Sequence, residues 1–306
     1  MVKRKNEIMT IGNAFEVYNL ERKAKGCVHD TIANSEFAMK LFLEDNNLSE
    51  RDPVQVLNRN IFISWSEFLQ MQDLSPESIN AYLSRMRSFV NWLIESDYLP
   101  YFKINLIKAQ EQQIKFFTDE ELEILCKKPK NDCDYVEYRT WVIICFILAT
   151  GCRSSTLCDI NLEDISDNRV YYRHLKNKQA VSVPLSNNIM NIINEYRRLW
   201  DIDSEYLFTD QYGNKLTVGA CRQALKKYCS RRGVKPRGPH SLRHSFAKTW
   251  ILNGGGLVQL QLMLNHKDLQ MTRHYVNIFC SEIQKDVEEY SALEFFVKSN
   301  KKVKRA

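Results

Sequence analysis

Two short segments in the last third of the chain carry side chains that could attack a phosphodiester. The first reads Pro-His-Ser-Leu-Arg-His at 239–244. The second reads Leu-Asn-His at 264–266 and is followed, after eight residues, by Tyr275. A phenol can act as a nucleophile, an imidazole can move a proton, and a guanidinium offers paired donors while it stays charged. This combination indicates phosphodiester chemistry that needs no metal.

Two further basic residues complete the set. Arg153 ends the run Ala-Thr-Gly-Cys-Arg at 149–153, and Lys176 stands in His-Leu-Lys-Asn-Lys at 174–178. Cleavage of a phosphodiester requires a nucleophile, relief of the charge on the non-bridging oxygens, and a proton for the oxygen that leaves. A phenol with the ordinary pKa of about 10 is roughly a thousandth ionised at neutral pH, so Tyr275 needs a base or a strongly positive environment.

The histidines allow two interpretations. His240 and His266 could bind a phosphate or handle the proton of the tyrosine. The alternative is a zinc site, because His240 and His244 are four residues apart. However, the zinc motif requires a glutamate directly after the first histidine, and this chain has Ser241 there, without a cluster of Cys or carboxylate residues to add ligands. We therefore expect neither a metal nor a cofactor, and we expect His244 and His274 to be structural or peripheral.

The order Arg, Lys, His-x-x-Arg, His, Tyr resembles that of the tyrosine recombinases, the family of phage integrases and Xer-type site-specific recombinases. The resemblance implies a DNA strand transesterification with Tyr275 as the nucleophile and a 3′-phosphotyrosyl intermediate. It implies that two arginines hold the phosphate and that Lys176 protonates the leaving oxygen. Lys176 is preferred to Lys178 because its distance to Pro184 resembles the family spacing. The implied catalytic residues are Arg153, Lys176, His240, Arg243, His266 and Tyr275.

Three features depart from the pattern of the family. Thr156 stands where many relatives carry an acidic residue, Asn265 stands where they usually have glycine, and glycines are missing around Lys176. None of these changes removes an implied catalytic group. They argue against the housekeeping Xer branch and favour an enzyme of a mobile genetic element.

The distribution of charge favours a polyanionic partner. The net charge is +6, with 43 basic and 37 acidic residues, and the segment from Arg222 to Arg243 contains no acid. A solvated helix face usually mixes signs, so this run favours phosphate binding. The predicted DNA-binding residues are Arg85, Arg87, Lys178, Arg222, Lys226, Lys227, Arg231 and Arg232.

The pattern of elements predicts a mainly helical α+β protein. A helix beginning at Leu-Ser-Pro-Glu, 74–77, has apolar residues on one face, and Thr118 with Glu121 forms a capping box. Residues 141–149 are apolar all round and indicate a buried helix, while 169–175 and 180–186 read as two strands joined by a short turn. We expect an N-terminal tail (1–9), an all-α core-binding domain (10–103), a linker (104–117), a catalytic domain with a small antiparallel sheet (118–297) and a basic tail (298–306).

Composition and the resemblance together predict the setting. Nine cysteines without a C-x-x-C pair, and no apolar run of the length that a membrane span needs, predict a reduced cytoplasmic protein. The resemblance implies duplex DNA as the partner and a homotetramer in the synaptic complex, with any accessory proteins unknown. Two alternatives stay open: a type IB topoisomerase that nicks and reseals one duplex, and a catalytically silent DNA-binding regulator on the same fold.

Overall fold

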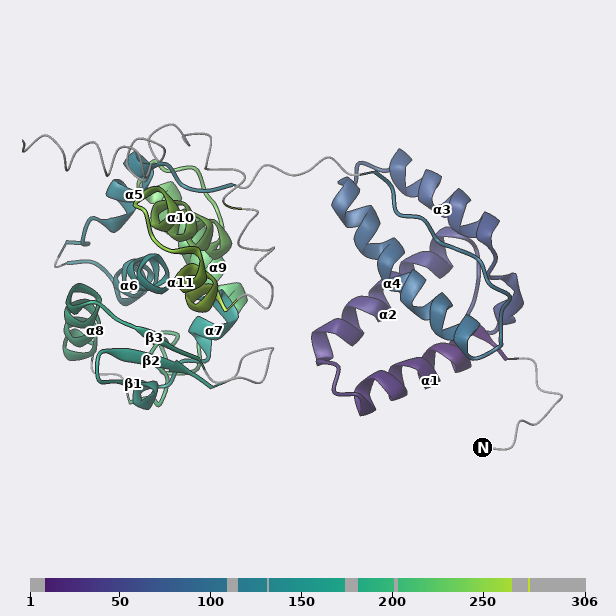
Figure 1. The fold of residues 1–306 in the computed structure, drawn as a ribbon, viewed down its shortest axis with the longest axis horizontal. Coiled ribbons are helices and arrows are strands. Elements are labelled where there is room, and N and C mark those ends of the chain that lie inside the picture. Colours follow the sequence, from purple (N-terminus) through teal and green to yellow (C-terminus); the bar gives the residue numbers. More distant parts are fainter. Residues whose placement is uncertain are drawn as a thin grey trace, which may run out of the picture. The chain divides into compact units, whose positions relative to one another are not determined.

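A computed structural model describes residues 9–108, 115–130, 132–173, 181–200, 203–265 and Tyr275. The chain divides into two compact units, Met1–Gln112 and Gln113–Ala306 (Figure 1). The division lies inside the stretch that the sequence indicates as a linker. Both units are built mainly from helices, and a small antiparallel sheet lies in the second, so the predicted fold class is confirmed.

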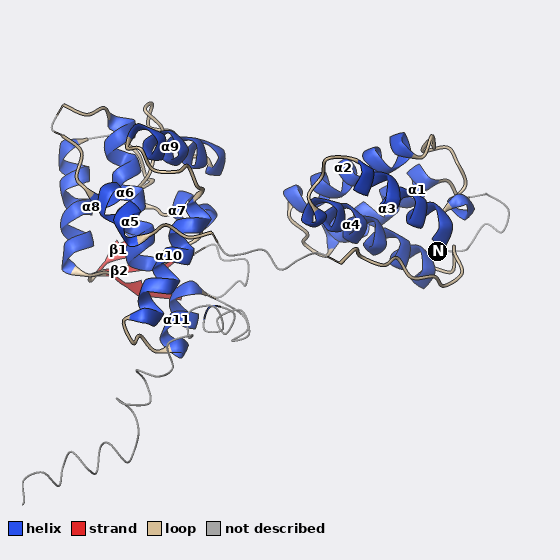
Figure 2. Ribbon diagram, turned by 90° about the horizontal axis from the view of Figure 1, so that it is seen from above, coloured by secondary structure: helices blue, strands red, loops and turns tan. Residues whose placement is uncertain are grey.

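The N-terminal unit is a bundle in which one helix contacts the other three (Figure 2). Its elements are α1 (Ile11–Ala24), α2 (His29–Asp45), η1 (Val54–Val56), α3 (Arg59–Met71) and the central α4 (Pro76–Glu95). Ser75 caps α4 by accepting a hydrogen bond from the Ser78 amide, and Pro76 takes the first turn, as predicted. The apolar face of α4 is buried, and each fully buried large side chain contributes about 1.5–3 kcal/mol to folding.

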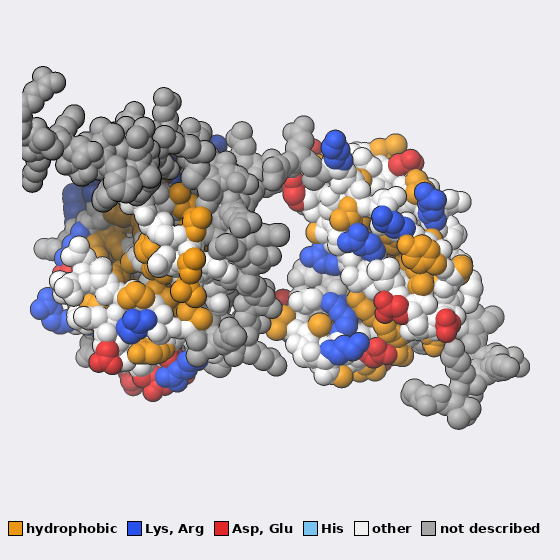
Figure 3. Space-filling model, viewed as in Figure 1, with side chains coloured by type: hydrophobic (Ala, Val, Ile, Leu, Met, Phe, Trp, Pro, Cys, Tyr) orange, Lys and Arg blue, Asp and Glu red, His pale blue; other side chains and the backbone are white. Residues whose placement is uncertain are grey.

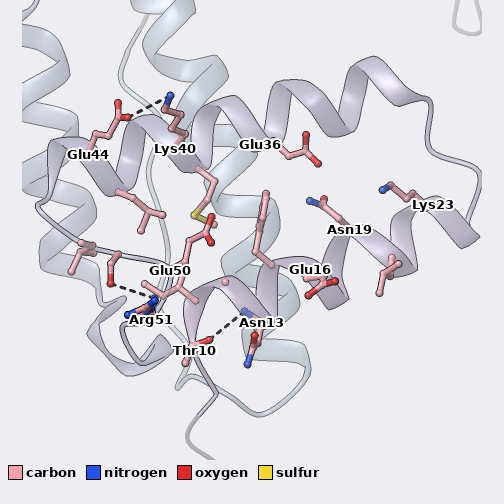
Figure 4. A pocket seen from close by; sticks show the side chains of 18 residues that line it. Thr10, Asn13, Glu16, Asn19, Lys23, Glu36, Lys40, Glu44, Glu50 and Arg51 are labelled. Carbon is pink, nitrogen blue, oxygen red and sulfur yellow. Dashed lines mark hydrogen bonds and ion pairs between the residues drawn. The ribbon is translucent and has the colours of Figure 1, made fainter.

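A cavity of about 980 Å³ lies between α1 and α2 (Figure 4). Apolar side chains such as Met39 and Leu43 form part of its wall, and charged side chains of both signs surround them. Lys40 and Glu44 form an ion pair of 3.7 Å at this wall. The mixed charge does not favour a polyanion, and no residue of the chemical set described above lines this cavity.

The C-terminal unit packs its helices around one buried helix, α6 (Tyr135–Thr150), which contacts four others. Nearly every residue of α6 is shielded from solvent, as the all-round apolar pattern predicts. The predicted capping box is present at the start of α5, between Thr118 and Glu121. The other helices are α5 (Asp119–Cys126), α7 (Ser154–Cys158), η2 (Leu162–Asp164), α8 (Asn187–Leu199), α9 (Val218–Arg231), α10 (Pro239–Leu252) and α11 (Leu257–Leu264).

The sheet has the order β1-β2-β3 with antiparallel pairing throughout. Its strands are β1 (Ile165–Ser166), β2 (Arg169–Tyr172) and β3 (Val181–Pro184), with Val170 opposite Val183. The sequence predicts the β2–β3 pair, although the described strands are shorter, and it does not predict the two-residue β1. The connection with Lys176 and Lys178 lies outside the described residues. Within the described part of the chain, no helix is both long and apolar enough to cross a membrane.

Candidate active site

A tight turn after α6 organises the site. Gly151 ends α6 with a left-handed backbone (φ 64°), a conformation that glycine adopts at little cost. A side chain here would also collide with its neighbours, because an added Cβ would overlap the ring of Phe246 and lie 2.8 Å from Leu264 Cδ2. The turn directs the chain into α7, so that Arg153 becomes the residue that precedes the first turn of that helix.

Arg243 connects this turn to the end of α11. The side chain is only 2% exposed and donates one hydrogen bond to the carbonyl of Gly151 and another to that of Leu264, both at 2.7 Å. Arg153 is half-buried and donates more weakly to the carbonyls of Leu264 and Asn265, at 3.4 and 3.5 Å. Asn265 is left-handed (φ 47°), which explains why it can replace the glycine that is usual in the family. The two guanidinium groups thus converge on the C-terminal end of α11.

The two guanidinium groups place two positive charges close enough together to interact. Burial and, to a smaller extent, the charge of Arg153 lower the pKa of Arg243 to about 10, against smaller opposing effects of which that of Tyr275 is the largest. Burial also lowers the pKa of Arg153. Among the described residues, no Asp or Glu contributes to either shift. Both groups are still protonated at neutral pH, and such an arrangement favours a bound anion.

Tyr275 lies beside this charge. Its side chain is 5% exposed and packs in an apolar cluster with Phe246, Leu260 and Leu264. Burial raises the pKa of the phenol, and the charges of Arg243 and Arg153 oppose that increase without cancelling it. Their influence shows that the phenol lies in the field of both guanidinium groups. In this environment the phenol is protonated at neutral pH.

Two histidines on α10 adjoin the tyrosine. The Tyr275 hydroxyl lies 2.8 Å from Nδ1 of His244, and the ring centroids of His244 and His240 are 4.3 Å apart in an edge-to-face arrangement. His240 keeps contact with solvent, yet desolvation and the charges of Arg243 and Arg153 lower its pKa. It is therefore neutral at pH 7. Among the described residues, no group of three or more His, Cys, Asp or Glu side chains is arranged to hold a metal.

The structure brings together four of the six residues that the resemblance implies, namely Arg153, His240, Arg243 and Tyr275. The other two implied catalytic residues, Lys176 and His266, lie outside the described residues, as does His274. Of the two roles expected for His244, structural or peripheral, the peripheral one is wrong, because this ring contacts the tyrosine hydroxyl. The feature of the sequence that could have placed His244 in the site is its spacing of four residues from His240, which puts both rings on one face of a helix.

The basic segment from Arg222 to Arg243 contains no acid, yet in the structure acidic side chains from another helix lie beside part of it. Arg232 forms a 2.8 Å ion pair with Glu137 and lies over the ring of Tyr228, while Arg231 lies 3.8–3.9 Å from acidic oxygens of Asp134 and Glu137. By contrast, three residues of α9 point into solvent: Arg222, Lys226 and Lys227. Arg231 is also exposed, but it lies beside Asp134 and Glu137.

The predicted contacts on the N-terminal unit lie on α4. Arg85 and Arg87 are both half-buried. A band of Lys and Arg side chains crosses the face of this unit that Figure 3 shows. Lys178 falls outside the described residues.

A buried arginine and a half-buried one beside a tyrosine, in a helical unit with a small antiparallel sheet, are typical of a protein that performs chemistry on phosphodiesters. The sequence profile of the phage integrase family matches residues 115–282, more than half of the chain. The tyrosine recombinase XerC of Staphylococcus epidermidis is 26% identical over 266 residues, covering 82% of this chain and 90% of the relative.

Solved structures agree on the fold. The Tn1549 transposon integrase in complex with transposon right end DNA has a TM-score of 0.72 at 18% identity, covering 93% of this chain and all of that one. A lambda integrase tetramer bound to a Holliday junction has a TM-score of 0.70 at 14% identity, covering 88% of this chain and 78% of that one. The chain belongs to the phage integrase family, and it is a site-specific tyrosine recombinase.

Proposed function

We propose that Tyr275 attacks a phosphodiester of duplex DNA and forms a 3′-phosphotyrosyl bond, while the bond to the 5′ oxygen breaks. The freed 5′ hydroxyl of one strand then attacks the phosphotyrosine of the partner strand, which completes the exchange. The ester conserves the energy of the phosphodiester bond, so the reaction requires no nucleotide. The observation that carries this proposal is the pair of guanidinium groups that act together on the phenol.

The roles of the other residues follow from their chemistry. Arg153 and Arg243 would hold the two non-bridging oxygens and stabilise the charge that develops on them. Lys176 would give a proton to the leaving 5′ oxygen, and the neutral imidazole of His240 would donate a hydrogen bond to the phosphate. His266 would add a further hydrogen bond. Two fixed guanidinium charges do the electrostatic work that a metal ion does in other phosphoryl-transfer enzymes, so we propose a reaction that is insensitive to chelators.

We propose that the protein acts as a homotetramer on two duplexes and serves a mobile genetic element. The tetramer is supported by the fold shared with the lambda integrase tetramer bound to a Holliday junction, and the mobile element by the fold shared with the Tn1549 transposon integrase. We further propose that residues 10–103 form a DNA-binding domain, that 104–117 link it to the catalytic domain at 118–297, and that both domains grip the duplex. Arg222, Lys226 and Lys227 are the preferred DNA contacts on α9.

A nicked suicide substrate tests the nucleophile. Its short 5′ fragment diffuses away after attack, so the wild-type protein should remain attached to the 3′ phosphate as an adduct that survives SDS. Tyr275→Phe removes one oxygen and keeps the ring, so it should bind the same DNA and form no adduct. A peptide map that places the nucleotide on another tyrosine would refute the assignment.

The alternatives give different results in the same experiments. A topoisomerase would form the adduct but would not exchange strands between two labelled duplexes. A silent regulator would bind DNA and form no adduct at all. EDTA should leave the rate unchanged, and a loss of activity that one divalent ion restores would contradict metal-free chemistry.

A further inference from the structure

We propose that His244 is the general base of the cleavage step and accepts the phenolic proton of Tyr275. The inference rests on the proposed function, since it assumes that Tyr275 is the nucleophile. Its basis is the 2.8 Å contact between His244 Nδ1 and the Tyr275 hydroxyl. This distance is that of a direct hydrogen bond, so a proton can pass between the two atoms without an intervening water.

The environment of Tyr275 makes a base necessary. Two nearby guanidinium groups would by themselves favour the phenolate, yet burial has the larger effect and the pKa of the phenol is raised. The ionised fraction at neutral pH is therefore below the roughly one thousandth of an ordinary tyrosine. Positive charge alone does not activate this nucleophile. A positioned base typically accelerates such a step by about 100- to 10,000-fold.

Of the two described histidines in the site, His244 has the position of a base. His240 lies one helical turn earlier, and its ring keeps contact with solvent. His244 is half-buried, and its ring lies between that of His240 and the phenol, 4.3 Å and 5.6 Å from them between centroids. The charged and titratable neighbours described here are Arg153, Arg243, His240 and Tyr275 itself.

The proton balance of the step is complete. The phenolic oxygen forms its bond to phosphorus as its proton moves to Nδ1 of His244, which requires the tautomer with hydrogen on Nε2. The bond to the 5′ oxygen breaks, and that oxygen takes a proton from Lys176, as set out under the proposed function. On rejoining, the 5′ hydroxyl attacks phosphorus and gives its proton back to Lys176, while the imidazolium of His244 returns its proton to the departing phenolate.

Single-turnover cleavage of the suicide substrate, measured from acid to alkaline pH, tests the role of His244. His244→Ala should slow cleavage by about 100-fold or more. His244→Asn places an amide oxygen near the position of Nδ1, so it can hold the phenol but cannot take up its proton. It should also be slow, and its rate should rise about tenfold per pH unit as the phenolate fraction grows. The wild type should lose rate at acid pH, where an imidazole becomes protonated.

His29→Asn provides the matched control, because this imidazole is exposed in the N-terminal unit. It should cleave as the wild type does, and all variants should bind DNA with equal affinity. If His244→Asn cleaves within a few fold of the wild type with the same pH profile, His244 only positions the ring and the proposal is wrong. Faster cleavage by His244→Ala would mean that the contact between His244 and Tyr275 restrains the tyrosine. That result would also refute the role of His244 as a general base.

The outcomes distinguish a failure of the general-base role of His244 from a failure of the proposed function of Tyr275. A wild-type protein that forms no adduct overturns the proposed function, whatever the His244 variants do. A wild-type adduct together with unimpaired His244 variants overturns only the general base. Should His244→Ala unfold, as its thermal midpoint would show, the pH profile of His244→Asn decides the question.

Discussion

The paired guanidinium groups predict that a small anion stabilises the free protein. The pKa of Arg243 falls from the ordinary arginine value to about 10, which corresponds to a cost of about 3 kcal/mol for holding its charge in the fold. The unfolded chain has the higher pKa, so stability would rise with pH only above about pH 10, until the pKa of an ordinary arginine is reached. Below about pH 10 the cost is present in full, and at neutral pH an anion bound between Arg153 and Arg243 can offset it.

The expected stabilisation can be compared with this cost. Sulfate at 100 times its dissociation constant would raise the unfolding free energy by about 2.7 kcal/mol. This gain is close to the cost of holding the Arg243 charge in the fold. For a unit of this size, 1 kcal/mol raises the midpoint by about 2–4 °C. Differential scanning calorimetry should therefore show an increase of about 5–10 °C over chloride at equal ionic strength.

Sulfate also stabilises proteins without binding to a specific site, so the comparison between variants carries the test. Arg153→Ala should retain only the general increase, because one of the two anion-binding groups is gone. Arg197→Ala removes an exposed charge on α8 and should respond as the wild type does. Equal increases in all three proteins would refute the argument that the site is built to bind an anion.

Three further predictions concern the turn, the end of α11 and the DNA contacts. Gly151→Ala should lower the unfolding free energy by about 2–4 kcal/mol, because it adds backbone strain and an overlap with Phe246. Gly233→Ala should lower it by only about 1–2 kcal/mol, because its added Cβ would meet nothing within 4 Å. Urea unfolding compares the two. Asn265→Gly should leave that free energy unchanged or raise it slightly, since glycine tolerates φ 47° at least as well. Replacing Lys226 and Lys227 together by alanine should reduce the salt dependence of DNA affinity by about two units in a log–log plot, and an unchanged slope would exclude them as phosphate contacts.

Local rules account for the parts of the fold that the sequence predicts correctly. The cap at Ser75, the capping box at Thr118 and the stop at Gly151 each depend on residues within one turn of the chain. The all-round apolar pattern of α6 predicts its burial for the same reason. The sheet is less predictable, since a two-residue strand such as β1 has no periodicity and forms only because β2 lies beside it.

Interactions between distant parts of the chain explain the parts that the sequence does not predict. Arg232 belongs to a basic run, yet its partner Glu137 lies 95 residues earlier, on the helix that forms the core. His244 shares a helix face with His240, but the residue that this face meets, Tyr275, lies 31 residues later. Spacing indicates which side chains lie together on an element, and it does not indicate which other element they face.

The arrangement around Arg243 connects folding to the chemistry. Two of its hydrogen bonds go to backbone carbonyls, which fix the side chain without neutralising its charge. An acidic partner would make the free protein more stable and would compete with the phosphate for the same guanidinium. The left-handed residues Gly151 and Asn265 sit at the ends of α6 and α11, where they help to present the carbonyls that hold Arg243 and Arg153. Neutral carbonyl groups thus help to hold both guanidinium groups in place.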